Sequence, residues 1–168
     1  NNRLKLFKFL RDQIDLGKQI FIVYPLIEES QKMDYKDLMD GYESICREFP
    51  LPKYKISIMH GKMNTEDKDY EMKRFLQGKS QIMVSTTVIE VGVNIPNANV
   101  MVIESSERFG LSQLHQLRGR VGRGNEQSFC ILMRGKKISN DAKLRLKTMV
   151  KTTDGFEIAE VDLKLRGP

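Results

Sequence analysis

Apolar and polar residues along this chain follow two alternating patterns. Five short apolar runs have the length of buried strands, and they cover residues 20–23, 56–59, 82–84, 100–103 and 129–133. Apolar residues also recur every three or four positions, as in amphipathic helices, over residues 4–16, 36–49, 65–76, 111–121 and 139–151. Continuous apolar strands separated by helices predict an α/β fold, with a mostly parallel central sheet that helices cover on both faces.

Residues with special backbone preferences predict where several of these elements begin and end. Gly17 and Gly78 follow the first and third helical stretches, and glycine is the residue that most readily ends a helix. Thr65 is suited to cap the third helix, and Glu66 and Asp67 then lie in its first turn, where the helix dipole favours negative charge. These helices are therefore expected to stop close to the limits of the apolar pattern.

Composition narrows the class of protein. The chain has 168 residues, 40% of them hydrophobic, which is enough for the core of one domain and argues against a disordered chain. A net charge of +6 and a pI near 9.3 favour a polyanionic partner. The apolar runs are too short to cross a membrane. The first residue is Asn1 rather than methionine, so we expect a longer parent protein.

The two cysteines, Cys46 and Cys130, lie far apart in the sequence, each within an apolar pattern. No cluster of histidines or further cysteines accompanies either one. We therefore expect small apolar side chains in a reducing compartment, and no metal site or disulfide framework.

The ligands of a parallel sheet bind beyond the carboxyl ends of its strands, so the segments that follow strands are the candidates for function. In residues 113–124, Arg120 and Arg123 are three positions apart, and a helix would place them on one face, where both reach one anion. Gly119 and Gly122 each cost a helix about 1 kcal/mol relative to alanine, which a sequence accepts where the backbone must come close to another group. Two converging arginines can stabilise a phosphoryl group in transfer. A basic surface helix, or one that contacts nucleic-acid phosphates, explains the composition equally well.

The segment 85–96 follows another strand and is rich in hydroxyl and amide groups. Thr86 and Thr87 supply donors suited to a phosphate. Gly92 allows a ligand to come close, and Asn94 can bond a ribose hydroxyl. Threonines that merely cap a short helix would account for the segment equally well.

His60 and Gly61 form a turn after the second strand, followed by Lys62. No carboxylate or serine is arranged with His60 as a catalytic triad, so we expect the histidine to orient a backbone or a phosphate. A P-loop is missing, because residues 78–80 read Gly-Lys-Ser but position 73, where a P-loop needs glycine, is Lys73. No Asp-Glu pair follows a strand to hold magnesium. The sequence therefore predicts that another domain holds most of the nucleotide, and that this chain alone does not hydrolyse ATP.

Together these segments resemble the second RecA-like domain of superfamily 2 helicases, and more narrowly the RecG branch of ATP-dependent DNA helicases. Residues 116–123 match the pattern Gln-x-x-Gly-Arg-x-Gly-Arg, known as motif VI, and residues 85–96 match motif V. The runs 86–93 and 108–124 and the tail 154–168 are similar to the RecG branch in particular. The resemblance covers nearly the whole chain.

The resemblance implies a role for each matching residue. The implied catalytic residues are Arg120 and Arg123, as arginine fingers on the γ-phosphate, and Gln116, as a link between the ATP site and the partner domain. The implied nucleotide contacts are Gly92, Asn94 and Gly119. The implied contacts to the nucleic-acid backbone are His60, Gly61, Thr86, Thr87 and Arg118. Many members carry an aspartate where this chain has Asn94, and asparagine still accepts a hydrogen bond.

The same resemblance implies cofactor, partners and location. The cofactor would be ATP with Mg²⁺, bound mainly by a preceding RecA-like domain. The partners would be branched double-stranded DNA, such as stalled forks and junctions in recombination and repair, together with that domain and a wedge domain of the same parent chain. We expect no membrane partner and a location in the bacterial cytoplasm, at the nucleoid.

The expected division places the RecA-like domain at residues 1–135 and a basic helical extension, the start of a translocation-coupling segment, at residues 136–168. Other interpretations stay open. A transcription-repair coupling factor shares much of the signature. A stand-alone, non-enzymatic nucleic-acid-binding module would use the basic helix at 136–151 only to neutralise phosphates. Half of an RNA helicase agrees less well with the RecG-like runs.

Overall fold

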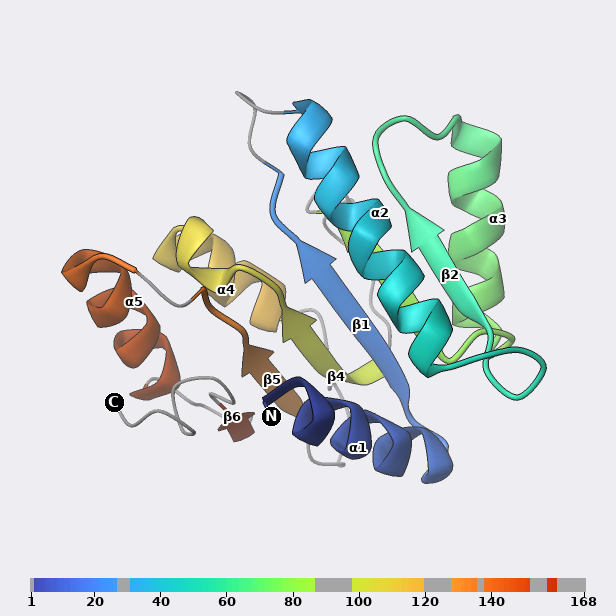
Figure 1. Ribbon diagram of the computed structural model, residues 1–168, viewed down its shortest axis with the longest axis horizontal. Helices are drawn as coiled ribbons and strands as arrows, with labels where there is room; N and C mark the ends of the chain where they lie inside the picture. Colours follow the sequence, from blue (N-terminus) through green and yellow to red (C-terminus); the bar gives the residue numbers. More distant parts are fainter. Residues whose placement is uncertain are drawn as a thin grey trace.

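A computed structural model describes residues 2–26, 31–86, 98–119, 128–135, 138–151 and 157–159 (Figure 1). The elements in chain order are α1 (Asn2–Asp15), β1 (Gln19–Tyr24), α2 (Gln31–Glu48), β2 (Ile56–Met59), α3 (Thr65–Leu76), β3 (Ile82–Thr86), β4 (Ala98–Ile103), the short 3-10 helix η2 (Ser106–Arg108), α4 (Leu111–Arg118), β5 (Phe129–Leu132), α5 (Asn140–Lys151) and β6 (Glu157–Ala159). The strands form one sheet in the order β2-β3-β1-β4-β5-β6. Every neighbouring pair is parallel, as the apolar pattern predicts.

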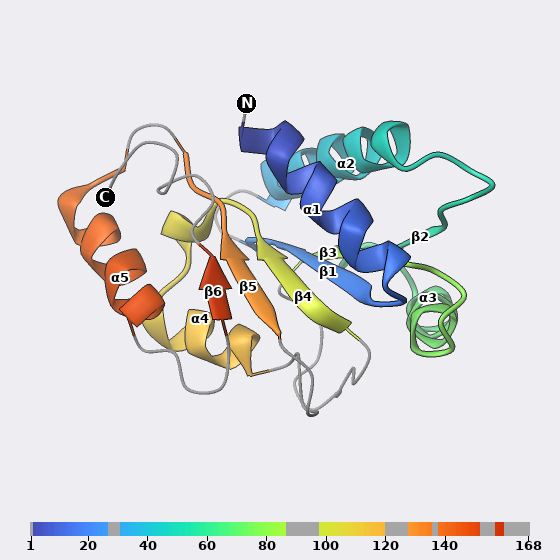
Figure 2. The same ribbon diagram turned by 90° about the horizontal axis from the view of Figure 1, so that it is seen from below.

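Helices cover both faces of this sheet, which confirms the predicted layers (Figure 2). Side chains of β1 alternate between the faces, as a strand requires. Ile20 and Ile22 pack in a cluster with residues of α1 and α2. Phe21 and Val23 pack in a second cluster with residues of α3, α4 and α5. The sheet is therefore buried on both faces, and its functional surface has to lie along an edge or at a strand end.

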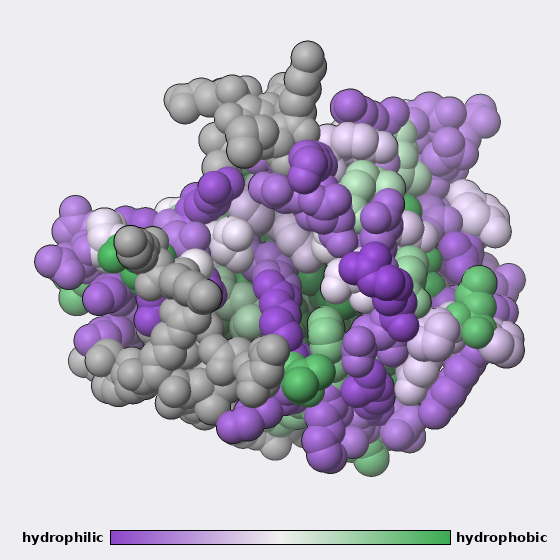
Figure 3. All heavy atoms as spheres, in the orientation of Figure 1, coloured by the Kyte–Doolittle hydropathy of each residue, from purple (hydrophilic) through white to green (hydrophobic). Residues whose placement is uncertain are grey.

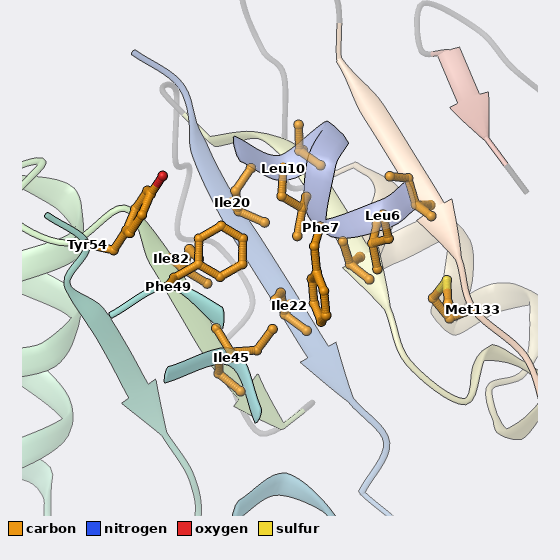
Figure 4. Close-up of a cluster of buried hydrophobic side chains, with 14 of the residues drawn as sticks. Leu6, Phe7, Leu10, Ile20, Ile22, Ile45, Phe49, Tyr54, Ile82 and Met133 are labelled. Atoms are coloured by element: carbon orange, nitrogen blue, oxygen red, sulfur yellow. The ribbon is translucent and has the colours of Figure 1, made fainter. Parts of the chain in front are cut away.

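The cluster beneath α1 and α2 is built around aromatic rings (Figure 4). Phe49, just after α2, meets Phe7 of α1 edge-to-face at 6.0 Å between ring centroids. Tyr54 meets the same Phe49 ring edge-to-face at 5.1 Å. Such pairs each contribute about 0.5–1.5 kcal/mol beyond the area they bury. These contacts join α1, α2 and the loop before β2 into one layer, whose outer surface is mostly hydrophilic (Figure 3).

A glycine inside α2 is explained by a ring on β1. A Cβ atom at Gly41 would lie 1.9 Å from Oη and 2.4 Å from Cζ of Tyr24. Helix α2 therefore accepts the propensity cost of glycine, about 1 kcal/mol relative to alanine, because the tyrosine ring occupies that space.

Several predicted boundaries are confirmed and others are wrong. Gly17 and Gly78 adopt the left-handed conformation, with φ of 85° and 76°. The N-cap of α3 is Asn64 rather than Thr65, because the Asn64 side chain accepts a hydrogen bond from the Asp67 backbone N–H at 2.8 Å. The second helix begins at residue 31, five positions before the apolar pattern suggests.

The helix predicted over 111–121 ends at Arg118 in the structure, and Gly119 is its C-cap. Arg120 and Val121, the last two residues of the predicted helix, lie outside the described residues. Gly119 is thus at the end of a helix and not within one, so the propensity cost of an internal glycine does not apply to it.

The region after residue 135 continues the layered arrangement. Leu146 and Met149 of α5 are fully buried and share a cluster with Phe109 and Leu114. Strand β6 pairs with β5 in the same parallel sense. The expected division of the chain at residues 135 and 136 stays a prediction.

Candidate nucleic-acid and nucleotide interface

The carboxyl edge of the sheet gathers several of the residues singled out in the sequence. Thr86 is the last residue of β3, and His60 follows β2 directly. β2 and β3 are neighbours, with Met59 beside Ser85 in the register. The two segments therefore meet at the same end of the sheet, as expected for ligand-binding loops of a parallel sheet.

Contacts around His60 define its hydrogen-bonding state. Nδ1 accepts a hydrogen bond from the Lys62 backbone N–H at 3.1 Å. Burial, together with the positive charges of Lys62 and Lys68, lowers the pKa of His60 below its usual value. The ring is therefore neutral near pH 7, and because Nδ1 accepts, the proton resides on Nε2. The histidine offers one N–H donor from an exposed turn.

Tyr35, near the start of α2, orders this turn from the other side. Its ring meets the His60 ring edge-to-face at 4.9 Å between centroids. The Lys62 ammonium lies 4.1 Å from the centroid of the Tyr35 ring, a cation–π contact. A Cβ atom at Gly61 would meet nothing within 4 Å, so the turn is open to a large ligand. The result is a set of donors suited to a phosphate, with the aromatic ring holding two of them in place.

Thr86 has an unusual environment. Its side chain is buried, and Oγ1 has no hydrogen-bond partner among the described residues. A buried hydroxyl without a partner costs free energy, about 1–3 kcal/mol. The neighbouring Ser85 hydroxyl, in contrast, donates to the Thr86 carbonyl at 2.9 Å. Within the described part of the chain, Thr86 is therefore a buried polar group without a partner next to a predicted phosphate site.

A cavity of about 420 Å³ lies at the carboxyl ends of β1 and β4. Its charged lining consists of Asp37, Asp40, Glu104 and Arg3. Both guanidinium nitrogens of Arg3 donate to Glu104, at 2.5 and 2.7 Å, so the arginine is neutralised within the cavity. Burial and the nearby Glu104 raise the pKa of Tyr24, which keeps this phenol protonated. Three carboxylates and one arginine leave the lining with an excess of negative charge, which disfavours a nucleotide triphosphate in this cavity.

The motif VI residues that the structure describes lie at the end of α4 and at its C-cap. Gln116 is exposed on the helix. A Cβ atom at Gly119 would make only ordinary contacts, 3.5 Å from the Gln116 carbonyl oxygen and 3.6 Å from that of His115. The packing of these neighbours therefore does not require glycine at this position, which agrees with a role in contact with another group.

Arg118 holds α4 to α5. One of its terminal nitrogens lies 2.9 Å from His115 Nδ1, and the other donates to the Met149 carbonyl at 3.4 Å. It also lies near the buried thiol of Cys130, whose pKa burial raises to about 12. The guanidinium is thus engaged inside the fold, and His115 is its packing partner.

Five predicted site residues lie outside the described residues: Thr87, Gly92, Asn94, Arg120 and Arg123. The structure brings together His60, Gly61 and Thr86 at one strand end, while Gln116, Arg118 and Gly119 lie on α4 and its cap. Tyr35 is the residue that the sequence did not indicate, since no spacing connects it with His60.

The described residues contain no group of three or more His, Cys, Asp or Glu side chains that could hold a metal ion. None of the described helices combines the length and the apolar character needed to span a bilayer.

A family model described as the helicase conserved C-terminal domain matches residues 4–125. The chain belongs to this helicase family. The match covers most of the chain, including the His60 turn and the whole of the motif VI pattern.

Individual relatives show which branch of the helicase family this chain resembles. The ATP-dependent DNA helicase RecG of Thermotoga maritima is 51% identical over 98% of this chain and 21% of its own length. The RecG helicase of Bacillus subtilis is 51% identical over 98% of this chain and 24% of its own length. The chain thus spans about a fifth to a quarter of the length of these relatives, and the resemblance to the RecG branch is confirmed.

Solved structures agree with the fold. A RecG structure bound to a three-way DNA junction is 48% identical, with a TM-score of 0.72 over 98% of this chain and 21% of that one. Yeast Dbp5 bound to RNA and ADP BeF3 gives a TM-score of 0.60 over 96% of this chain and 39% of that one, at 17% identity. The likeness to Dbp5 shows the shared fold alone. The likeness to the RecG structure confirms the RecA-like fold class predicted from the sequence.

Proposed function

We propose that this chain is the second motor domain of an ATP-dependent DNA helicase that remodels branched DNA. The observation that carries the proposal is the motif VI pattern at residues 116–123 in a chain half identical to RecG helicases. A relative 48% identical is bound to a three-way DNA junction, which supports forks and junctions as the substrate class. The preceding RecA-like domain and a wedge domain would be its partners in the parent chain, at the nucleoid in the bacterial cytoplasm.

ATP, when bound between the two motor domains, would supply the free energy for translocation. Mg²⁺ would bind with the nucleotide, held mainly by the preceding RecA-like domain. Arg120 and Arg123 would stabilise the γ-phosphate, and the exposed Gln116 would face the partner domain. Gly92, Asn94 and the uncrowded Gly119 would allow the nucleotide to come close.

The carboxyl edge would grip the DNA backbone. The His60 Nε2–H, the open Gly61 and the Lys62 ammonium form one set of donors. Thr86, whose buried hydroxyl has no partner among the described residues, ends the neighbouring strand β3. Such groups contact phosphates without reading bases. Thr87 and Arg118 complete the proposed contacts, although the guanidinium of Arg118 is already engaged within the fold.

The test is DNA-stimulated ATP turnover in a protein that carries both motor domains. Arg120→Ala and Arg123→Ala should each lower turnover about a thousandfold or more and leave DNA affinity nearly unchanged, because arginine fingers act on the transition state. Arg108→Ala, at an exposed arginine that precedes α4, is the matched control and should keep full turnover. Full turnover in both finger variants would refute the assignment. ATP hydrolysis above background by this chain alone would show a nucleotide cradle that the proposal lacks.

A further inference from the structure

A second basic surface lies at the opposite end of the β2–α3 unit from the His60 turn. A hollow of about 630 Å³ opens there, which we name the lysine hollow. Its charged and apolar lining consists of Leu51, Lys55, Tyr70, Lys73, Arg74 and Lys79. Lys55 directly precedes β2, and Lys79 lies between α3 and β3. The hollow is therefore at the amino edge of the sheet, and its volume lies within the roughly 300–1,000 Å³ range of ligand pockets.

Positive charge in the lysine hollow is not compensated within the described part of the chain. Arg74 is paired with Glu71 at 3.0 Å. Lys55, Lys73 and Lys79 are exposed and have no carboxylate within salt-bridge distance among the described residues. The dipole of α3 favours positive charge near its C-terminus, where Lys73 and Lys79 lie, whereas Lys55 comes from the loop before β2. Their convergence indicates an anionic ligand.

An exposed aromatic ring accompanies these charges. Tyr70 is 63% exposed, and the Arg74 guanidinium carbon lies 5.8 Å from the centroid of its ring. Leu51, which also lines the hollow, is 74% exposed. An aromatic ring beside a cationic groove is typical of single-strand binding, because an unpaired base can stack on the ring while the cations follow the phosphates. A duplex would hide its bases from Tyr70.

We propose that the lysine hollow binds single-stranded DNA, with one base stacked on Tyr70 and the phosphates held by Lys55, Lys73 and Lys79. The inference rests on the proposed function, since a protein that remodels branched DNA works on substrates that can carry unpaired strands. It adds a contact separate from the backbone grip at the carboxyl edge, because the two surfaces lie at opposite ends of the 12-residue helix α3, about 18 Å apart.

Fluorescence anisotropy of this chain with a labelled oligothymidine of about 16 nucleotides tests the proposal. The variant Lys55→Ala, Lys73→Ala, Lys79→Ala should bind at least tenfold more weakly, and its slope of log affinity against log salt should be smaller by about 2. Lys5→Ala, Lys8→Ala, Lys36→Ala removes the same charge from α1 and α2 and should bind nearly as the parent does. Thermal melts of each variant establish that it is folded.

Tyr70 separates stacking from charge. Tyr70→Ala should weaken binding about tenfold, and Tyr70→Phe should restore it, because only the ring is required. The proposal is overturned if the two triple variants bind alike, if Tyr70→Phe is as weak as Tyr70→Ala, or if a duplex of equal length loses as much affinity as the single strand does. If Lys62→Ala weakens duplex binding while the Lys55, Lys73 and Lys79 variant binds oligothymidine as the parent does, this inference alone is refuted. If neither set of substitutions weakens DNA binding, the proposed function is refuted as well.

Discussion

Buried polar side chains at the amino and carboxyl ends of β1, β2 and β3 differ in their hydrogen bonding. At the amino edge, the buried Gln19 amide donates to the carbonyls of Phe75 and Ser80, at 2.7 and 2.8 Å. The Ser57 and Ser80 hydroxyls bond each other at 2.7 Å. At the carboxyl edge, the Thr86 hydroxyl is buried without a partner in the described residues. Within the part of the sheet formed by β1, β2 and β3, the amino-edge groups thus hold the fold together, while Thr86 Oγ1 at the carboxyl edge has no partner in the described residues. Farther along the amino edge, Ser128 Oγ, just before β5, also has no partner in the described residues.

The largest expected effect on stability is at Gln19. Gln19→Met keeps the length of the side chain and removes both donors, so the free energy of unfolding should fall by about 1–3 kcal/mol. Urea denaturation measures the loss, with Gln13→Met, at a half-buried position of α1, as the control. Duplex affinity should stay unchanged, and a loss of duplex affinity in the folded variant would place the backbone grip at this edge.

Removal of a side-chain hydroxyl should change the free energy of unfolding in opposite directions at the two edges. Ser57→Ala removes a satisfied bond and should lower the free energy of unfolding by about 1 kcal/mol. Thr86→Val keeps the side-chain volume and removes a hydroxyl that has no partner among the described residues, so stability should stay the same or rise by up to about 1 kcal/mol, while DNA affinity falls. Urea midpoints and anisotropy on the same preparations measure both. A destabilised Thr86→Val would show that the hydroxyl has a structural partner.

The smallest expected effect is the pH response of the His60 turn. Because the pKa of His60 is lowered in the folded state, its contribution to stability is present above the ordinary histidine pKa, about 6.5, and is lost as the pH falls through the lower, folded value. The urea midpoint should therefore drop more between pH 7.5 and 5 in the parent than in His60→Gln. An identical drop in both proteins would contradict this environment for the ring.

Local signals in the sequence account for much of the fold. Apolar runs locate the strands, and Gly17 and Gly78 end helices where a left-handed residue is needed. The wrong cap at Thr65 has a local cause, since Asn64 and Thr65 are both good caps and only the geometry selects Asn64. The partners of Gln19 lie 56 and 61 residues away, so no local pattern could indicate them.

The residues of the candidate site were predicted from their residue types and from their positions after strands, not from side-chain contacts. The His60 turn and Thr86 were indicated because they follow strands, and the structure places them at one strand end. Tyr35, which contacts both His60 and Lys62, lies 25 positions before His60 and was not indicated. The charged lining of the cavity at the carboxyl ends of β1 and β4 likewise depends on residues from α1, from α2 and from directly after β4, which only the fold brings together.

The central claim is that the carboxyl edge grips the DNA backbone. Its most direct test is the salt dependence of duplex affinity for the parent chain, for Lys62→Ala and for Lys5→Ala, which removes an exposed lysine from α1. Loss of one phosphate contact should lower the slope of log affinity against log salt by about 1 in Lys62→Ala, with no change in Lys5→Ala. Equal slopes for all three proteins would contradict the account.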